Sequence, residues 1–203
     1  MTEDEMLEAM RRNWAEERRF YSNDGKEERE RWVVGEFLTH LKVPFAVEEI
    51  TSLPQDNAAD VEFRSARFQV KEIMTPAERR HAEIKDIFNR VDAAKRLQDT
   101  IGPGFVYDTP APIDGYALIS TEATKLAHDP KYLPSKQDLN LAFYVTRSGA
   151  SMPGAWTIDR TELSKLGWRS ISCLIRDQAI VMFASLEAPD FLRRALAMGD
   201  SDT

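Results

Sequence analysis

Two stretches near the start of the chain repeat apolar residues at the spacing of an amphipathic helix. In residues 3 to 21, apolar side chains recur three or four positions apart among many charges, which predicts a peripheral helix. The turn sequence SNDG at 22 to 25 ends this helix. A second helix is predicted over residues 26 to 41, and its apolar face consists of Val33, Val34, Phe37, Leu38 and Leu41.

Three short segments after the second helix alternate apolar and polar residues and predict strands. They are FAVEEIT at 45 to 51, DVEFR at 60 to 64 and RFQVKEI at 67 to 73. A two-residue turn separates the last two segments, so we expect them to form a hairpin. A longer apolar series at positions i, i+3, i+4 and i+7 predicts a helix over about 77 to 98.

A connector of about 100 to 140 follows, and its part at 102 to 114, GPGFVYDTPAPID, is rich in proline and glycine. A short helix is expected at STEATKLA, with Ser120 or Thr121 as its cap, and further strands and helices are predicted after the connector. The segment LNLAFYVT at 139 to 146 predicts a buried strand. Residues 147 to 203 predict a small helix, a β-hairpin and a C-terminal helix. Because strands and helices intermix, we expect a single α/β (α+β) domain over residues 1 to 203, built around one mixed sheet.

The composition is ordinary for a globular protein, with 42% hydrophobic and 30% charged residues among 203, enough to close a core. No apolar run approaches the roughly 20 residues that cross a bilayer. The N-terminus is charged throughout, so we expect a cytoplasmic protein with no membrane partner. Cys173 is the only cysteine. It is expected in the core, with no internal disulfide, no Cys-based zinc site and no disulfide-linked partner.

The net charge of −7 argues against nucleic-acid binding by bulk electrostatics. The charge is unevenly distributed, because residues 71 to 96 carry seven basic and five acidic side chains. Three of the basic residues, Arg79, Arg80 and Lys85, follow the predicted hairpin closely. They are candidates for contacts with nucleic-acid phosphates, and a solvated helix face is the alternative.

The predicted hairpin carries polar and charged residues where a core hairpin would carry apolar ones. Side chains alternate along a strand, so Gln69 and Lys71 point to one side while Phe68 and Val70 point to the other. The tight turn brings Asp60, at the start of the partner strand, back toward Gln69 and Lys71. An unpaired charge in a sheet core is costly, so this arrangement predicts polar partners or a metal ion.

The second predicted helix carries a carboxylate on its apolar face. At about 100° per residue, Glu30 lies on the same face as Val33 and Phe37. A helix packed on the sheet can therefore bring Glu30 to the polar side of the hairpin. The alternative is an ordinary surface acid that pairs with a basic residue one helical turn away.

These residues resemble the PD-(D/E)XK nuclease fold, which is shared by type II restriction enzymes, Holliday-junction resolvases and many repair nucleases. The family motif is an acid, a turn and an apolar strand with (Asp/Glu/Gln)-x-Lys, and here it corresponds to Asp60 and FQVKEI. The predicted element order over 26 to 98 and 139 to 146 is similar to the αβββαβ core of that restriction-endonuclease-like fold. Residues 1 to 22 and 147 to 203 would be additions. The chain is also similar to an uncharacterised bacterial family that carries an endonuclease label on fold grounds.

The resemblance implies hydrolysis of DNA phosphodiester bonds with Mg²⁺ or Mn²⁺. It assigns metal binding to Asp60 and Gln69, contact with the phosphate or the attacking water to Lys71, and an accessory acid role to Glu30. Magnesium prefers oxygen ligands and keeps several waters, so a carboxylate and an amide oxygen suffice. DNA is the expected partner, and a homodimer is consistent with this interpretation.

Two departures from the family pattern weaken the expectation of catalysis. Gln69 stands where a second acid is usual, which makes the site less negative and metal binding weaker. The PD dipeptide is AD here, with Pro54 and Asp56 as another assignment. Lys71 as a lysine that protects a sheet edge, and Asp60 as a turn residue, are the structural alternatives.

Two other classes of function therefore stay open. The second hypothesis is a nuclease-fold protein without catalysis that acts as an interaction module, which the Gln and the acidic net charge favour. The third is a small-molecule enzyme with a pocket near GFVYDTPAPIDGY, at 104 to 116.

Overall fold

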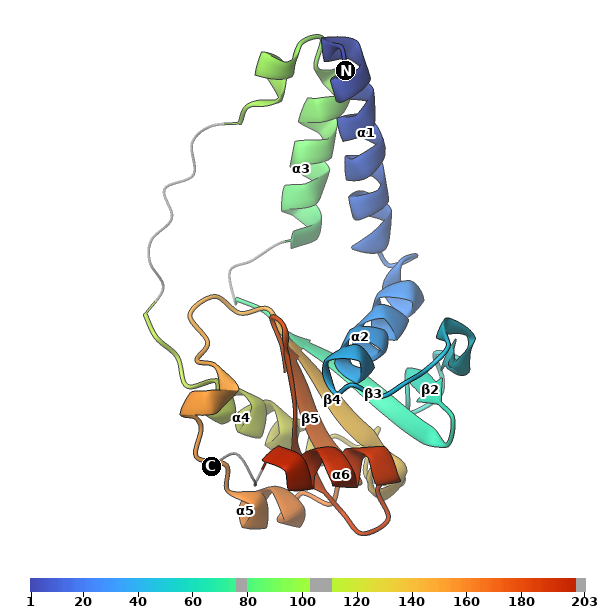
Figure 1. The fold of residues 1–203 in the computed structure, drawn as a ribbon, viewed down its shortest axis with the longest axis vertical. Helices are drawn as coiled ribbons and strands as arrows, with labels where there is room; N and C mark the ends of the chain where they lie inside the picture. The colour runs from blue at the N-terminus through green and yellow to red at the C-terminus, as the bar shows by residue number, and fades with distance from the viewer. Residues whose placement is uncertain (76–79, 103–110, 200–203) are drawn as a thin grey trace. The chain divides into compact units, whose positions relative to one another are not determined.

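The chain forms two compact units in the computed structural model (Figure 1). Unit 1 consists of Met1–Arg29 and Pro76–Thr109, and unit 2 consists of Glu30–Thr75 and Pro110–Thr203. Unit 1 thus combines two segments that are distant in sequence, and the single domain of residues 1 to 203 stays a prediction. The residues that the structure describes are 1–75, 80–102 and 111–199.

Unit 1 is built from two helices that pack along each other, α1 (Glu3–Phe20) and α3 (Arg80–Ala93). The guanidinium group of Arg11 donates a hydrogen bond to the backbone oxygen of Ala94 at 2.7 Å. A short 3₁₀ helix, η2 (Leu97–Thr100), follows α3 and also contacts α1. Unit 1 is thus a helical pair, and it contains no strand among its described residues.

The helix predicted over 77 to 98 is shorter in the structure and belongs to a different part of the molecule. It corresponds to α3, which packs with α1 and is not part of the sheet-containing unit. The nuclease-like core over 26 to 98 and 139 to 146 stays a prediction. Apolar residues such as Ile84 and Val91 are buried as their spacing indicates. That spacing shows that one face of a helix is buried, but it does not show which element covers it.

Unit 2 contains a six-stranded mixed sheet with the strands in sequence order. Strands β3 to β5 are parallel to one another, and the other neighbours are antiparallel. The structure thus confirms a mixed α/β architecture. The strands are β1 (Ile50–Ser52), β2 (Val61–Phe63), β3 (Ala66–Ile73), β4 (Asn140–Val145), β5 (Ser170–Ile175) and β6 (Gln178–Ala184).

The first hairpin differs in detail from its prediction. Three of the seven residues expected as a strand over 45 to 51 form a 3₁₀ helix, η1 (Val47–Glu49), and only the last two belong to β1. The β2–β3 turn consists of Arg64 and Ser65, one residue earlier than predicted, and Arg64 takes a positive φ of 54°. The alternation along β3 is unaffected, so Gln69 and Lys71 still share one side of the strand.

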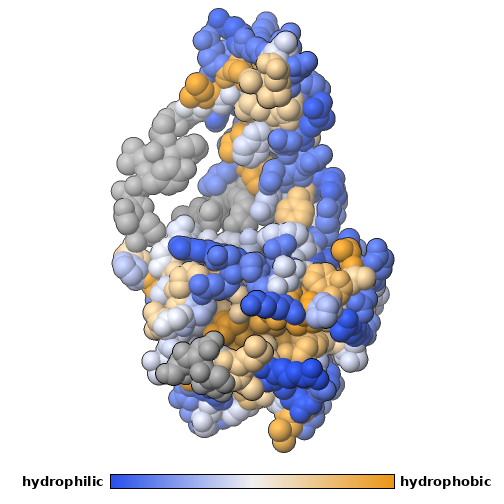
Figure 2. All heavy atoms as spheres, in the orientation of Figure 1, coloured by the Kyte–Doolittle hydropathy of each residue, from blue (hydrophilic) through white to orange (hydrophobic). Residues whose placement is uncertain are grey.

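Helices cover both faces of this sheet. The buried residues of α2 and α6 pack with Phe68 and Val70 on one face, whereas α4 and α5 pack with Leu141 and Phe143 on the other. In Figure 1, α2 and α6 lie in front of the sheet and α4 lies behind it, and in Figure 2 apolar residues are visible between α2 and α6. The bounds of these helices are α2 (Lys26–His40), α4 (Gly115–Ala127), α5 (Arg160–Lys165) and α6 (Asp190–Gly199).

Several predicted elements are confirmed. The buried strand expected over 139 to 146 is β4, and the C-terminal part contains the expected hairpin and closing helix. Cys173 is fully buried on β5, and burial raises the pKa of its thiol. Within the described ranges, no helix has the length and apolar character needed to cross a membrane.

Candidate functional site

The hairpin places the Asp60 carboxylate against β3. The backbone N–H of Asp60 donates to the oxygen of Phe68 at 2.8 Å, which fixes Asp60 directly before β2. Its Oδ2 atom accepts hydrogen bonds from the backbone N–H of Val70 at 2.9 Å and from Nε2 of Gln69. The structure therefore brings Asp60 and Gln69 together.

Gln69 is buried on β3, with 1% of its surface exposed. Its Nε2 donates to the Asp60 carboxylate and also to the backbone oxygen of Val70 at 3.2 Å. Its Oε1 is buried and has no hydrogen-bond partner among the described residues. A buried polar atom without a partner costs about 1 to 3 kcal/mol. A ligand, water or cation bound at Oε1 would supply the interaction that this oxygen lacks.

Lys71 follows two positions later on the same side of β3, and its side chain is half-buried. Its Nζ lies 5.8 Å from the centroid of the Tyr132 ring. Burial raises the pKa of the Tyr132 hydroxyl, the charge and hydrogen bond of Lys131 lower it, and the charges of Asp60 and Asp129 raise it further. Tyr132 is thus close to both Asp60 and Lys71, and it links the three predicted residues of the hairpin into one cluster.

The packing of α2 bears on the predicted role of Glu30. The buried residues of α2 pack with Phe68 and Val70, which point to the opposite side of β3 from Gln69 and Lys71. The apolar face of α2 therefore lies on the opposite side of β3 from Gln69 and Lys71, and the accessory acid role of Glu30 stays a prediction. Helical phase identifies the buried face of a helix, but it does not identify the side of the sheet on which the helix packs.

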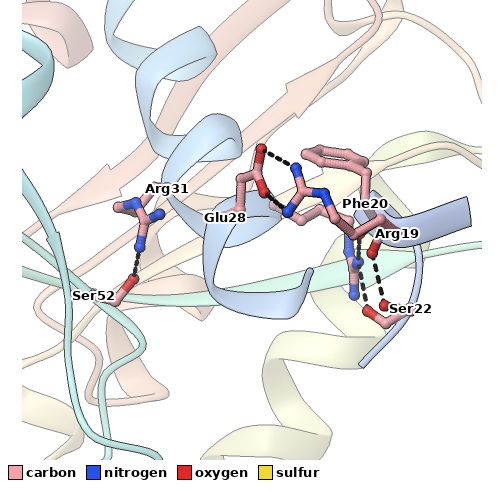
Figure 3. A network of polar contacts seen from close by, with 7 residues as sticks. Arg19, Phe20, Ser22, Glu28, Arg31 and Ser52 are labelled. Atoms are coloured by element: carbon pink, nitrogen blue, oxygen red, sulfur yellow. Dashed lines mark hydrogen bonds and ion pairs between the residues drawn. The ribbon is translucent and has the colours of Figure 1, made fainter. Parts of the chain in front are cut away.

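A contact in unit 2 fixes α2 on this side of the sheet. Arg31 donates a hydrogen bond to the Ser52 hydroxyl of β1 at 2.5 Å (Figure 3). Figure 3 also shows an ion pair within unit 1 between Arg19 and Glu28. The distance from Nη1 of Arg19 to Oε2 of Glu28 is 2.6 Å. Both contacts join charged residues to partners that satisfy them, and we assign them a structural role.

The residues predicted to contact phosphates lie on or before α3. Arg79 is outside the described residues, and so is the side chain of Arg80. Lys85 is exposed on α3 in unit 1. Their role stays a prediction. The segment predicted to line a small-molecule pocket, 104 to 116, also lies largely outside the described residues.

Asp60 and Gln69 supply oxygen atoms of the kind that Mg²⁺ prefers as ligands. Among the residues that the structure describes, no three His, Cys, Asp or Glu side chains form a group that could hold a metal. Mg²⁺ needs only one or two carboxylates with further oxygen ligands and water, and the partnerless Oε1 of Gln69 is such an oxygen.

Tyr132 and Lys131 are site residues that the sequence did not reveal. They lie in the segment predicted only as a connector, after α4. Lys131 places its Nζ 5.1 Å from the centroid of the Tyr132 ring. The only feature of the sequence that could have indicated them is a tyrosine directly after Asp-Pro-Lys, which is typical of a turn. In the structure, the carboxylate of Asp129 accepts a hydrogen bond from the Lys131 backbone N–H at 2.9 Å. Such a turn has no periodicity that would connect it to β3.

A pocket of about 530 Å³ lies elsewhere in unit 2, between the β2–β3 turn and the start of α6. It contains none of the residues of the Asp60 cluster. Its four arginines all have partners: the side chains of Glu49 and Asp190 and the backbone oxygen of Glu187. The arginines are Arg64, Arg169, Arg193 and Arg194. We assign no site there, because these cations are already engaged.

Comparisons with known proteins give one family and one similar structure. A family model described as "Putative endonuclease, protein of unknown function (DUF1780)" matches residues 2–199. A solved structure from Pseudomonas aeruginosa strain PAO1 is 26% identical, with a TM-score of 0.62, over 97% of this chain and 93% of its own. Its title describes a protein of unknown function of the monooxygenase superfamily. No curated protein matches the chain.

Proposed function

The chain belongs to the DUF1780 family, whose description names an endonuclease, and we propose that it hydrolyses DNA phosphodiester bonds at Asp60, Gln69 and Lys71 with a divalent cation. One observation carries the proposal. A carboxylate, a buried amide oxygen without a partner and an ammonium group meet on one side of β3. These are the groups that phosphodiester hydrolysis requires, because negative charge develops on the phosphate as the attacking water approaches.

The roles follow from the chemistry of each group. Asp60 and Oε1 of Gln69 would hold Mg²⁺ or Mn²⁺, which when bound supplies a water of lowered pKa and neutralises charge on the phosphate. Lys71 would donate hydrogen bonds to a phosphate oxygen from its position over Tyr132. The backbone N–H of Val70 keeps the Asp60 carboxylate oriented toward the site.

The order of elements in unit 2 supports a restriction-endonuclease-like core. Along the chain, α2 is followed by β1, β2 and β3, and then α4 precedes β4, which pairs in parallel with β3. This is the αβββαβ order, in which α4 takes the place expected for the helix predicted over 77 to 98. The monooxygenase description belongs to the similar structure, and we do not transfer it to this chain. The groups on β3 are a carboxylate, an amide and an ammonium group, which suit metal and phosphate binding.

A second candidate function is favoured by one contact. Gln69 donates its amide hydrogen to the Asp60 carboxylate, so the two proposed ligands already satisfy part of each other's hydrogen bonding. A nuclease-fold protein that binds a partner without cleaving it would retain this pair. This candidate predicts binding of nucleic acid or protein with no hydrolysis.

Cleavage assays decide between these functions. Plasmid, single-stranded and branched DNA are incubated with the protein in Mg²⁺ or Mn²⁺. We expect Lys71→Ala to lower the cleavage rate by about 100-fold or more, as loss of one charge-stabilising donor does in other enzymes. Lys125→Ala is the matched control, because its side chain is 73% exposed on α4 and pairs with Glu122.

Two results would contradict catalysis. Equal cleavage by the wild type and Lys71→Ala would show that a contaminating nuclease is responsible. No cleavage of any of the three substrates, with either metal, would support the binding function instead.

A further inference from the structure

The Tyr132 ring has an ammonium group from two different segments near its face. Nζ of Lys71, on β3, lies 5.8 Å from the ring centroid, and Nζ of Lys131, in the turn after α4, lies 5.1 Å from it. Both distances are in the range of a cation–π contact, in which the ring attracts the cation. The Tyr132 ring therefore contacts two ammonium groups, those of Lys71 and Lys131, which are sixty positions apart in the sequence.

The ring is a fixed platform. Tyr132 has 2% of its surface exposed, and its ring packs against Trp168 with 5.6 Å between the centroids. Its backbone N–H donates to Asp129 at 3.0 Å, and its backbone oxygen accepts from Lys136 at 2.8 Å. Because the ring cannot move freely, each ammonium group has a rigid partner in place before any ligand arrives, which lowers the entropy cost of binding.

Two acidic side chains also lie near the Tyr132 ring, and both already accept hydrogen bonds. Asp60 and Asp129 are the acids close enough to raise the pKa of the Tyr132 hydroxyl. The carboxylate of Asp129 accepts a hydrogen bond from the backbone N–H of Lys131, and that of Asp60 accepts from Val70 and Gln69. Lys131 is exposed, so its ammonium group can meet a ligand that reaches Lys71.

We propose that Lys131 and Lys71, held by Tyr132, form a phosphate-binding pair beside Asp60 and Gln69. The ligand is a phosphate group of a nucleic-acid strand, so the inference rests on the proposed function and adds two residues to its site. Lysine binds phosphate as a compact point charge with several donors. Contacts with backbone phosphates fix the position of a strand without reading its sequence. Lys131 is thus a binding residue, and Tyr132 is a positioning residue for both lysines.

Titration with inorganic phosphate, followed by NMR of the lysine Cε and Nζ signals, tests the pair without catalysis. We expect the signals of Lys71 and Lys131 to shift together with one dissociation constant, whereas the Lys125 signal stays in place. Lys131→Gln should weaken phosphate binding at Lys71 about fivefold, which is the change expected for one exposed ion pair. Lys125→Gln makes the same charge change away from the ring and should leave the titration unaltered.

Variants of the ring test the positioning role. Tyr132→Phe keeps the aromatic face and should retain the phosphate response of both lysines. Tyr132→Leu removes the face and should abolish the joint response, provided that circular dichroism shows a folded protein. Shifts of Lys71 and Lys131 no larger than that of Lys125, or an unchanged titration in Lys131→Gln, would overturn the proposal.

Binding of a short DNA duplex in Ca²⁺ tests whether the lysine pair binds nucleic-acid phosphate as well as free phosphate. Because this assay measures binding and not cleavage, it also tests the pair independently of the proposed function. Weaker duplex binding by Lys131→Gln, with unchanged binding by Lys125→Gln, supports the pair even if the wild type cleaves no DNA. Equal duplex binding by wild type and Lys131→Gln overturns the pair as a nucleic-acid site even if cleavage depends on Lys71.

Discussion

Gln69 is the residue on which the chemistry of the cluster depends. It occupies the position on β3 where a second carboxylate is usual in the resembling nucleases, and it is buried against Asp60. As an amide, it avoids the repulsion that two neighbouring carboxylates would have without a cation. The same amide gives a cation only one neutral oxygen, so metal binding by this pair should be weak.

Gln69→Glu tests this balance at the level of a single residue. Without divalent cation, the change buries a carboxyl group beside Asp60 and removes a hydrogen bond, so we expect the free energy of unfolding to fall by about 2 kcal/mol. With Mg²⁺ at about 100 times its dissociation constant, binding should restore about 2.7 kcal/mol. Thermal unfolding with and without Mg²⁺ measures both effects.

Gln178→Glu is the control for this prediction, because Gln178 is exposed at the start of β6. Because Gln178→Glu keeps Gln69, its response to Mg²⁺ should match that of the wild type. If Mg²⁺ leaves the melting temperature of Gln69→Glu unchanged, Asp60 and residue 69 do not form a metal site.

At the scale of elements, α4 determines where the cluster lies. Its buried residues, among them Ile119 and Ala123, cover the face of the sheet to which Gln69 and Lys71 point, and the turn after it delivers Lys131 and Tyr132. Asp114 starts the helix by accepting hydrogen bonds from the backbone N–H groups of the first turn. The position of the cluster therefore depends on the packing of one helix.

Ile119→Ala tests the packing of α4. Ile119 is fully buried, so we expect a loss of about 2 to 5 kcal/mol in the free energy of unfolding measured in urea. Leu186→Ala, at a side chain that is 84% exposed, should change it by less than about 0.5 kcal/mol. A cost for Ile119→Ala similar to that for Leu186→Ala would show that α4 does not cover the sheet as described.

At the scale of the whole molecule, the net charge of −7 limits how nucleic acid can be bound. A chain of this charge repels DNA at long range, so binding has to come from a small number of local cations. The Lys71–Lys131 pair in unit 2 is one such group, and Lys85 and its neighbours in unit 1 are a predicted second.

The salt dependence of duplex binding counts these contacts. With Ca²⁺ in place of Mg²⁺, the lysine pair alone predicts a slope of about −2 in a plot of log affinity against log salt concentration. Lys131→Gln should make the slope shallower by about one. If the wild-type slope is steeper and Lys85→Gln also makes it shallower, the cations of α3 contribute as predicted; a slope near zero would contradict both groups.

The sequence by itself determined the local arrangement of the hairpin. Alternation along a strand places Gln69 and Lys71 on one side, and a two-residue turn returns Asp60 to them. The buried strand β4 and the C-terminal hairpin could be predicted for the same reason, because a period of two reports a strand whatever surrounds it.

Only the tertiary structure decided which elements meet at that hairpin. It packed the apolar face of α2 on the side of β3 opposite to Gln69 and Lys71, and it placed the helix after the hairpin in unit 1. It also brought Tyr132 and Lys131 to Lys71. The physical reason is that periodicity records how much of a segment is buried, whereas the partner that buries it is fixed by contacts between residues far apart in the chain.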